Sequence, residues 1–154
     1  MAAAAGPVAT RIRSFVMRAG RMTAGQEQGW QQGFPQFGLT VAQGALDWDK
    51  TFGSPGRRVL EIGFGMGDSL LQMAQAEPET QFVGIEVHRP GVGRLLSQAL
   101  GLGIGNLRVY AEDAVDVLSH CVAPASLDAV HIFFPDPWHK KRHHKRRLIQ
   151  PKFV

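Results

Sequence analysis

The sequence predicts an α/β fold in which a mostly parallel sheet is covered by helices on both faces. From residue 58 onward, short apolar runs alternate with segments of helical periodicity. The apolar runs are residues 58–63, 81–86, 107–110 and 128–134, and the helical segments are residues 67–77, 90–100 and 114–120. The runs are nearly continuous in apolar residues, which is typical of parallel strands buried on both faces. A chain of 154 residues has the size of one such domain.

The chain before the first predicted strand has a different composition. Residues 11–21 interleave four arginines with apolar side chains, which indicates either a solvated surface arm or an extension that contacts RNA. Residues 23–38 are rich in Gln and Gly and contain Trp30, Phe34 and Phe37. We expect this second stretch to be irregular and to pack on the domain through its aromatic side chains.

The remaining segments set the predicted domain boundary. A short helix is expected within residues 39–52, and the Gly-Ser-Pro-Gly sequence at residues 53–56 is a clear break. The chain is therefore divided into a basic amino-terminal arm with its irregular segment, residues 1–38, and a folded domain, residues 39–154.

The first predicted strand ends in a glycine-rich turn. Three glycines at alternate positions, Gly63, Gly65 and Gly67, separate this strand from the next helix. Glycine permits backbone conformations that a side chain forbids and lets the chain approach a ligand closely. In open α/β sheets, ligands bind beyond the carboxyl ends of the strands. The pattern indicates either a ligand-binding turn or a plain connection from strand to helix.

An acidic residue ends the second predicted strand. Glu86 lies 25 positions after Glu61, and an acid at this place suits paired hydrogen bonds to ribose hydroxyls. A dinucleotide and S-adenosylmethionine both fit that geometry. The glycine spacing differs from the GxGxxG dinucleotide fingerprint, and Asp68 places a carboxylate at the helix start, where a pyrophosphate requires positive potential. These residues favour S-adenosylmethionine over the alternative, a dinucleotide-dependent oxidoreductase.

Further acids lie at the same predicted edge of the sheet. Either Glu112 or Asp113, after the third strand, could accept a hydrogen bond from an adenine amino group, and Asp113 also suits the N-cap of the next helix. Glu61 lies below the glycine turn. It either faces the methionine end of the cofactor or is a buried acid that satisfies loop amides.

The net charge of +4 is unevenly distributed along the chain. Residues 51–138 carry ten acidic and five basic side chains, whereas the chain after His139 carries seven Lys or Arg and no acid. Such asymmetry indicates a polyanionic partner. The basic run either neutralises phosphates or is a charged, solvent-facing start of a helix.

Other site classes receive less support from the sequence. The lone Cys121 excludes an internal disulfide, fits a reducing cytoplasm and is expected to be an apolar filler. No apolar run reaches the length of a membrane span. His139 and His143 have a spacing that could ligate a metal, but the surrounding lysines and arginines disfavour a dication, so no metal site is predicted.

Five motifs together resemble those of the bacterial tRNA (guanine-N7)-methyltransferases. The motifs are RSFVMRAGRMTAGQ, LEIGFGMGDSL, GIEVHRPGVG, NLRVYAEDAVDVL and FFPDPWHKKRHHKRR. The resemblance runs in register from Arg11 to the end of the chain. It implies a Rossmann-like, three-layer αβα fold of the class I methyltransferases, with strand order 3-2-1-4-5-7-6. It also implies S-adenosylmethionine as the methyl donor, a guanine in the tRNA variable loop as the substrate, and a cytoplasmic enzyme with no obligate protein partner.

The resemblance also implies which side chains form the site. The acids Glu61, Glu86 and Asp113, with the turn glycines Gly63, Gly65 and Gly67, are expected to bind the cofactor. Asp136 is expected to serve in both cofactor binding and catalysis. The residues expected to contact substrate and RNA are Lys140, Arg142, His143, His144, Lys145, Arg146 and Arg147.

The family pattern continues past Val154. Its next part brings a fifth strand that ends in an aspartate and a Thr-x-x-Glu element that holds the target guanine. We therefore expect a domain truncated after the fourth strand, whose open apolar edge predicts poor solubility. A fragment that only binds RNA and cofactor is the alternative to an active methyltransferase.

The chemistry implied by the resemblance leads to a specific hypothesis for the role of Asp136. Guanine N7 carries an in-plane lone pair and no proton, so the reaction depends mainly on alignment. A carboxylate that accepts hydrogen bonds from the guanine N1 and N2 side would increase electron density at N7. We expect Asp136 to do this or to fix the base, with flanking prolines that restrict its backbone. Trp138 either stacks on a base or packs in the core.

Overall fold

A computed structural model describes residues 21–132 of the chain. Its elements, in chain order, are α1 (Ala24–Phe37), β1 (Gly38–Leu39), the 3-10 helix η1 (Val41–Gln43), α2 (Trp48–Phe52), β2 (Arg58–Ile62), α3 (Asp68–Ala76), β3 (Gln81–Ile85), α4 (Arg89–Leu102), β4 (Leu107–Tyr110), α5 (Ala114–His120) and β5 (Ala129–Ile132). Among these residues the strands form one sheet in the order β1-β4-β3-β2-β5, and every neighbouring pair is parallel. The predicted α/β fold is confirmed.

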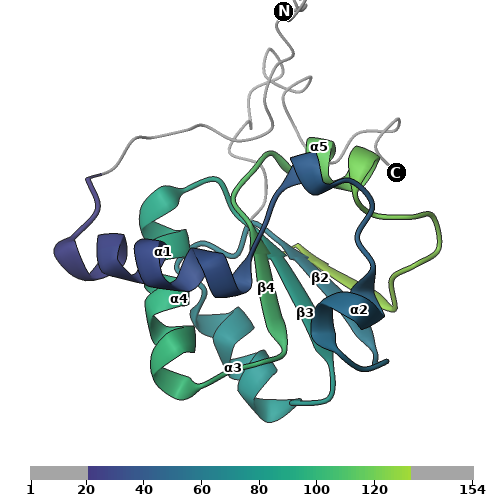
Figure 1. The fold of residues 1–154 in the computed structure, drawn as a ribbon, viewed down its shortest axis with the longest axis horizontal. Helices are drawn as coiled ribbons and strands as arrows, with labels where there is room; N and C mark the ends of the chain where they lie inside the picture. Colours follow the sequence, from purple (N-terminus) through teal and green to yellow (C-terminus); the bar gives the residue numbers. More distant parts are fainter. Residues whose placement is uncertain (1–20, 133–154) are drawn as a thin grey trace, which may run out of the picture.

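Two apolar clusters lie on opposite faces of the sheet. One cluster joins Val59, Phe82 and Leu107 to side chains of α1, α3 and α4. The other joins Leu60 and Val83 to α2 and α5. Neighbouring residues of a strand enter different clusters because successive side chains point to opposite faces. Figure 1 shows the resulting three layers, with α1, α3 and α4 grouped apart from α2 and α5.

The four strands predicted from the sequence occupy the expected places. In space they run β4-β3-β2-β5, which is the predicted order 3-2-1-4. The helix expected near residues 114–120 is α5, and the short helix expected within residues 39–52 is α2. The break at residues 53–56 follows α2, whose C-cap, Gly53, has the left-handed conformation (φ 82°).

The stretch predicted to be irregular is instead a helix. α1 begins with a capping box in which the side chain of Thr23 accepts from the amide of Gln26, while the side chain of Gln26 accepts from the amide of Thr23. Its two buried glycines face α4: a Cβ at Gly29 would lie 2.7 Å from Cβ of Ser97, and one at Gly33 would lie 2.8 Å from Cβ of Leu96. The helix therefore depends on close packing against α4, which composition alone did not reveal.

The last strand differs from the central ones in exposure. Its side chains alternate between half-buried and exposed, and Val130 and Ile132 are 48% and 38% exposed. The prediction of a strand buried on both faces is therefore wrong for the described part of residues 128–134. Among residues 21–132, β5 pairs only with β2, so its other edge has no described partner strand. Phe133 and Phe134 lie outside the described residues.

The close approach of α1 and α4 predicts that Gly29→Ala destabilises the chain. The added methyl group would clash with the carbonyl oxygen of Gly93 and with Ser97. We expect the free energy of unfolding to fall by about 1–3 kcal/mol, as measured by urea denaturation followed by circular dichroism.

Gly25→Ala is the matched control in the same helix. Its added Cβ would lie 4.0 Å from the nearest heavy atom, Oγ1 of Thr23, and alanine has the higher helix propensity. Equal stabilities of the two variants would show that the helices do not need the glycine contact.

Candidate functional site

The carboxyl ends of three neighbouring strands bring the predicted acids to one edge of the sheet. Ile62, Ile85 and Tyr110 lie level with one another in β2, β3 and β4. The ladder continues one residue further, because the amide of Gly63 donates to the Ile85 carbonyl at 2.8 Å and the amide of Glu86 donates to the Tyr110 carbonyl at 3.1 Å. The glycine turn, Glu86 and the acids after β4 therefore begin at the same level.

The glycine turn has the backbone conformation that its sequence indicated. Gly63, Gly65 and Gly67 have φ values of 74°, 63° and 83°, in the left-handed region that side chains disfavour. Gly67 is the N-cap of α3, and its amide donates to the Phe64 carbonyl at 3.0 Å. The carbonyl oxygen of Gly65 packs directly on Gly91 in the first turn of α4, where no Cβ would fit.

Glu86 holds the glycine turn in place. The residue is 8% exposed; its Oε1 accepts from the amide of Gly65 at 3.0 Å, and its Oε2 accepts from the amide of Val87 at 3.1 Å. Burial raises the pKa of this carboxyl, while backbone amides of Val87, Gly65 and His88 oppose that rise. Each carboxylate oxygen keeps a second lone pair, so Glu86 can still accept hydrogen bonds from a ligand.

Glu61 is the most buried of the predicted acids that the structure describes. Its exposed fraction is 2%, and its Oε2 has no hydrogen-bond partner among the described residues. The sequence left open whether loop amides satisfy this acid, but no described loop amide donates to Oε2. Burial raises the pKa of Glu61 to about 7. A buried carboxylate oxygen without a donor is costly, and a cation or hydrogen-bond donor beside it would remove that cost.

The two acids after β4 have different partners. Oδ1 of Asp113 accepts from the amide of Val115 at 2.9 Å and caps α5, as the sequence predicted. Oε2 of Glu112 accepts from the amide of Val41 at 2.7 Å, across a long sequence separation. No local sequence pattern indicates that second contact, because Val41 and Glu112 are 71 residues apart.

An ion pair changes the electrostatic argument at the start of α3. Asp68 Oδ1 lies 3.2 Å from a guanidinium nitrogen of Arg94, and the two side chains are 62% and 42% exposed. Arg94 partly offsets the carboxylate that was expected to repel a pyrophosphate. The glycine spacing is therefore the main feature that disfavours a dinucleotide.

Several predicted site residues lie outside residues 21–132. They are Asp136, Trp138, His139, Lys140, Arg142, His143, His144, Lys145, Arg146 and Arg147. Within the described part of the chain, no group of three or more His, Cys, Asp or Glu side chains could hold a metal ion. Helices that are long and apolar enough to cross a membrane are also absent from that part. Cys121 is buried in the second apolar cluster, as expected for an apolar filler.

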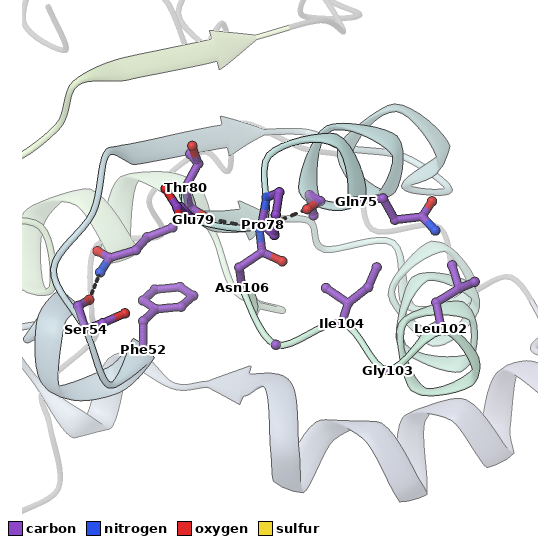
Figure 2. A pocket seen from close by; sticks show the side chains of 13 residues that line it. Phe52, Ser54, Gln75, Pro78, Glu79, Thr80, Leu102, Gly103, Ile104 and Asn106 are labelled. Carbon is purple, nitrogen blue, oxygen red and sulfur yellow. Dashed lines mark hydrogen bonds between the residues drawn. The ribbon is translucent and has the colours of Figure 1, made fainter.

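A hollow of about 520 Å³ lies at the opposite edge of the sheet, near the amino ends of β3 and β4. Figure 2 shows its lining, which includes Phe52, Leu102, Ile104 and Asn106. The amide nitrogen of Asn106 donates to the carbonyls of Ala74, Glu77 and Thr80 at 2.9–3.0 Å. None of the site residues predicted from the sequence lines this hollow.

Comparison with known proteins identifies similar chains. Residues 56–154 match a protein family described as "Putative methyltransferase". The tRNA (guanine-N(7)-)-methyltransferase of Pseudomonas entomophila (strain L48) is 62% identical over 144 residues, which are 94% of this chain and 60% of that protein. The enzyme of the same name from Stutzerimonas stutzeri (strain A1501) is 60% identical over 143 residues, which are 93% of this chain and 60% of that protein. The chain thus spans about 60% of the length of these curated relatives.

One solved structure is also similar. It is described as a putative methyltransferase from Thermoplasma acidophilum, with a TM-score of 0.45 and 23% sequence identity. The match covers 64% of this chain and 44% of that one.

The buried Glu61 predicts that stability falls as the pH rises. Folding raises its pKa from an ordinary value of 4.5 to about 7, so the folded state binds more protons than the unfolded state between these values. The free energy of unfolding should therefore decrease between about pH 4.5 and 7, by an amount on the order of 3 kcal/mol from this group. Urea denaturation of Glu61→Gln at a series of pH values should show a flatter dependence than the wild type.

Glu79→Gln removes the same charge at an exposed position and serves as the control. It should keep the wild-type dependence on pH. If Glu61→Gln and Glu79→Gln gave the same curves, burial of Glu61 would not be the cause.

Proposed function

The chain belongs to the methyltransferase family that its residues 56–154 match, and from this premise we propose that it serves tRNA (guanine-N7)-methylation. In this proposal the methyl group of S-adenosylmethionine is transferred to N7 of a guanine in the tRNA variable loop. The reaction is placed in the cytoplasm, with tRNA as the macromolecular partner. The resemblance inferred from the five sequence motifs is confirmed by the relatives named above.

One observation carries the proposal: three buried acids lie at the carboxyl edge of the sheet, and one of them, Glu86, binds the glycine turn. Glu61, Glu86 and Asp113 are each less than 9% exposed; Glu61 lies in β2, and the other two follow the neighbouring strands β3 and β4. S-adenosylmethionine offers a ribose diol, an adenine amino group and a positively charged sulfonium, all of which suit carboxylates. When bound, it supplies the electrophilic methyl group.

Each of the three carboxylates suits a different part of the cofactor. Glu86 already fixes Gly65 and retains acceptor capacity, so we assign it to the ribose hydroxyls. Asp113 is held by its N-cap bond to Val115, and we assign its carboxylate to the adenine amino group. Glu61, whose Oε2 has no partner among residues 21–132, is assigned to the cationic methionine end. Gly63, Gly65 and Gly67 allow the backbone to approach the ligand closely.

The substrate side of the proposal depends on residues beyond Ile132. Guanine N7 has a lone pair and no proton, so the site needs no base to free the nucleophile, and orientation supplies much of the rate. We assign Asp136 to the guanine, where it accepts hydrogen bonds or fixes the base. Lys140 is assigned to substrate, and the basic run is assigned to tRNA phosphates. The basic run is Arg142, His143, His144, Lys145, Arg146 and Arg147.

We include residues 11–21 in the proposal as an RNA-contacting extension; residues 11–20 lie outside the described part of the chain. The helix that follows this stretch is described: Gln26, near the start of α1, packs on Gly93 in the first half of α4, and α4 begins at the carboxyl edge of β3.

Calorimetric titration with S-adenosylhomocysteine tests the cofactor assignment. The chain should bind this product analogue and should not bind NAD. Glu86→Ala should weaken binding by at least about tenfold, because it removes a charged acceptor and releases Gly65. Glu79→Ala, an exposed carboxylate on another surface, should bind as the wild type does. Binding of NAD in place of S-adenosylhomocysteine would favour the oxidoreductase alternative.

Methyl transfer to unmodified tRNA tests the reaction and the role of Asp136. In a full-length relative, Asp136→Asn should lower the turnover number by about 10²-fold or more if the carboxylate aligns the guanine. Full turnover by this variant would remove Asp136 from the mechanism. For the 154-residue chain, cofactor binding without methyl transfer would support the alternative of an RNA- and cofactor-binding module.

A further inference from the structure

The segment between β1 and α2, residues 40–47 and here called the connector, lies at the same edge of the sheet as the candidate site. Gly38 and Leu39 pair with Val109 and Tyr110 of β4 in parallel. The connector therefore leaves β1 at the level where Ala111 leaves β4. Neighbouring strands are about 4.8 Å apart, so the connector borders the acids that follow β4.

The connector is held to the β4–α5 unit by two side chains acting on one residue. Oε2 of Glu112 accepts from the amide of Val41 at 2.7 Å, and Sγ of Cys121 donates to the carbonyl of Val41 at 3.9 Å. Burial raises the pKa of the Cys121 thiol, which keeps it protonated as a donor. A third bond, from the amide of Leu46 to the Cys121 carbonyl at 2.8 Å, fixes the other end of the connector.

Glu112 is the only anionic member of this attachment among the described residues. A hydrogen bond to an ionised acceptor is shorter and stronger than one between neutral groups. Oε2 of Glu112 accepts a hydrogen bond from the amide of Val41, whereas the next residue, Asp113, caps α5. The two adjacent acids therefore act on different segments that flank the same part of the site.

We propose that the connector forms the wall of the cofactor site beside β4, and that Glu112 is the positioning residue that holds this wall in place. The inference rests on the proposed function, because it takes S-adenosylmethionine as the ligand. Val41 and Leu46 are partly buried against the second apolar cluster, which fixes the connector on the core. Its remaining surface then forms a rigid boundary for the adenine ring whose amino group we assign to Asp113.

Two variants separate a positioning role from a direct charge contact with the ligand. Glu112→Gln keeps a side-chain oxygen that can accept from the amide of Val41, whereas Glu112→Ala removes it. Hydrogen exchange of the peptide that spans residues 40–46, measured by mass spectrometry on the free chain, reports on the attachment itself. Calorimetric titration with S-adenosylhomocysteine reports on the site, and Glu79→Ala is the control for both measurements.

Glu112→Ala should increase exchange across residues 40–46 and weaken S-adenosylhomocysteine binding by about tenfold, while Glu112→Gln, which keeps a neutral acceptor, should have a smaller effect on both. The inference is overturned if Glu112→Ala leaves either measurement unchanged. It is also overturned if both variants weaken binding equally, because Glu112 would then act through its charge. If the wild type does not bind S-adenosylhomocysteine, the proposed function fails, and with it the role of the connector as a cofactor wall. The exchange data would still decide whether Glu112 anchors the connector.

Discussion

The bond between the carboxylate of Glu86 and the amide of Gly65 joins the end of β3 to the turn that follows β2. The candidate site depends on this contact, because a turn of three glycines has little intrinsic preference for one conformation. The parallel register supplies the other constraint, since it places the ends of β2, β3 and β4 level with one another. Together they convert three sequence-distant segments into one row of acids.

The start of α4 extends this constraint to the amino-terminal part of the domain. Gly91 lies against the carbonyl of Gly65, and Gly93 lies against Gln26, where an added Cβ would be 2.5 Å from the carbonyl oxygen. One helical turn is therefore packed between the glycine turn and α1. Arg89, at the first residue of α4, also lies 4.4 Å from the ring centre of Trp30 in α1. A helix before the first central strand thus helps to set the position of the site.

The sequence was sufficient for the central sheet and insufficient for contacts between distant segments. Buried parallel strands are continuous apolar runs, so β2, β3 and β4 were predicted within about one residue of their bounds. α1 was missed because its glycines and the internal Pro35 lower helix propensity, although the Thr23–Gln26 capping box was a local signal. Among the site residues, the N-cap role of Asp113 was predictable from local sequence. The partner of Glu112 was not, because Val41 lies 71 residues away.

The three carbonyls that surround the side-chain amide of Asn106 bear on the order in which the chain folds. α3 ends at Ala76 without a glycine cap, and the Asn106 amide binds carbonyls at its end and in the loop after it. These acceptors are 26–32 residues from Asn106, at the entrance to β4. The last turn of α3 therefore gains the Asn106 donor only after α4 has formed and the chain has reached β4. Helix completion and strand docking become a single cooperative event, so the nascent β2–α3–β3 unit alone would have a frayed helix end.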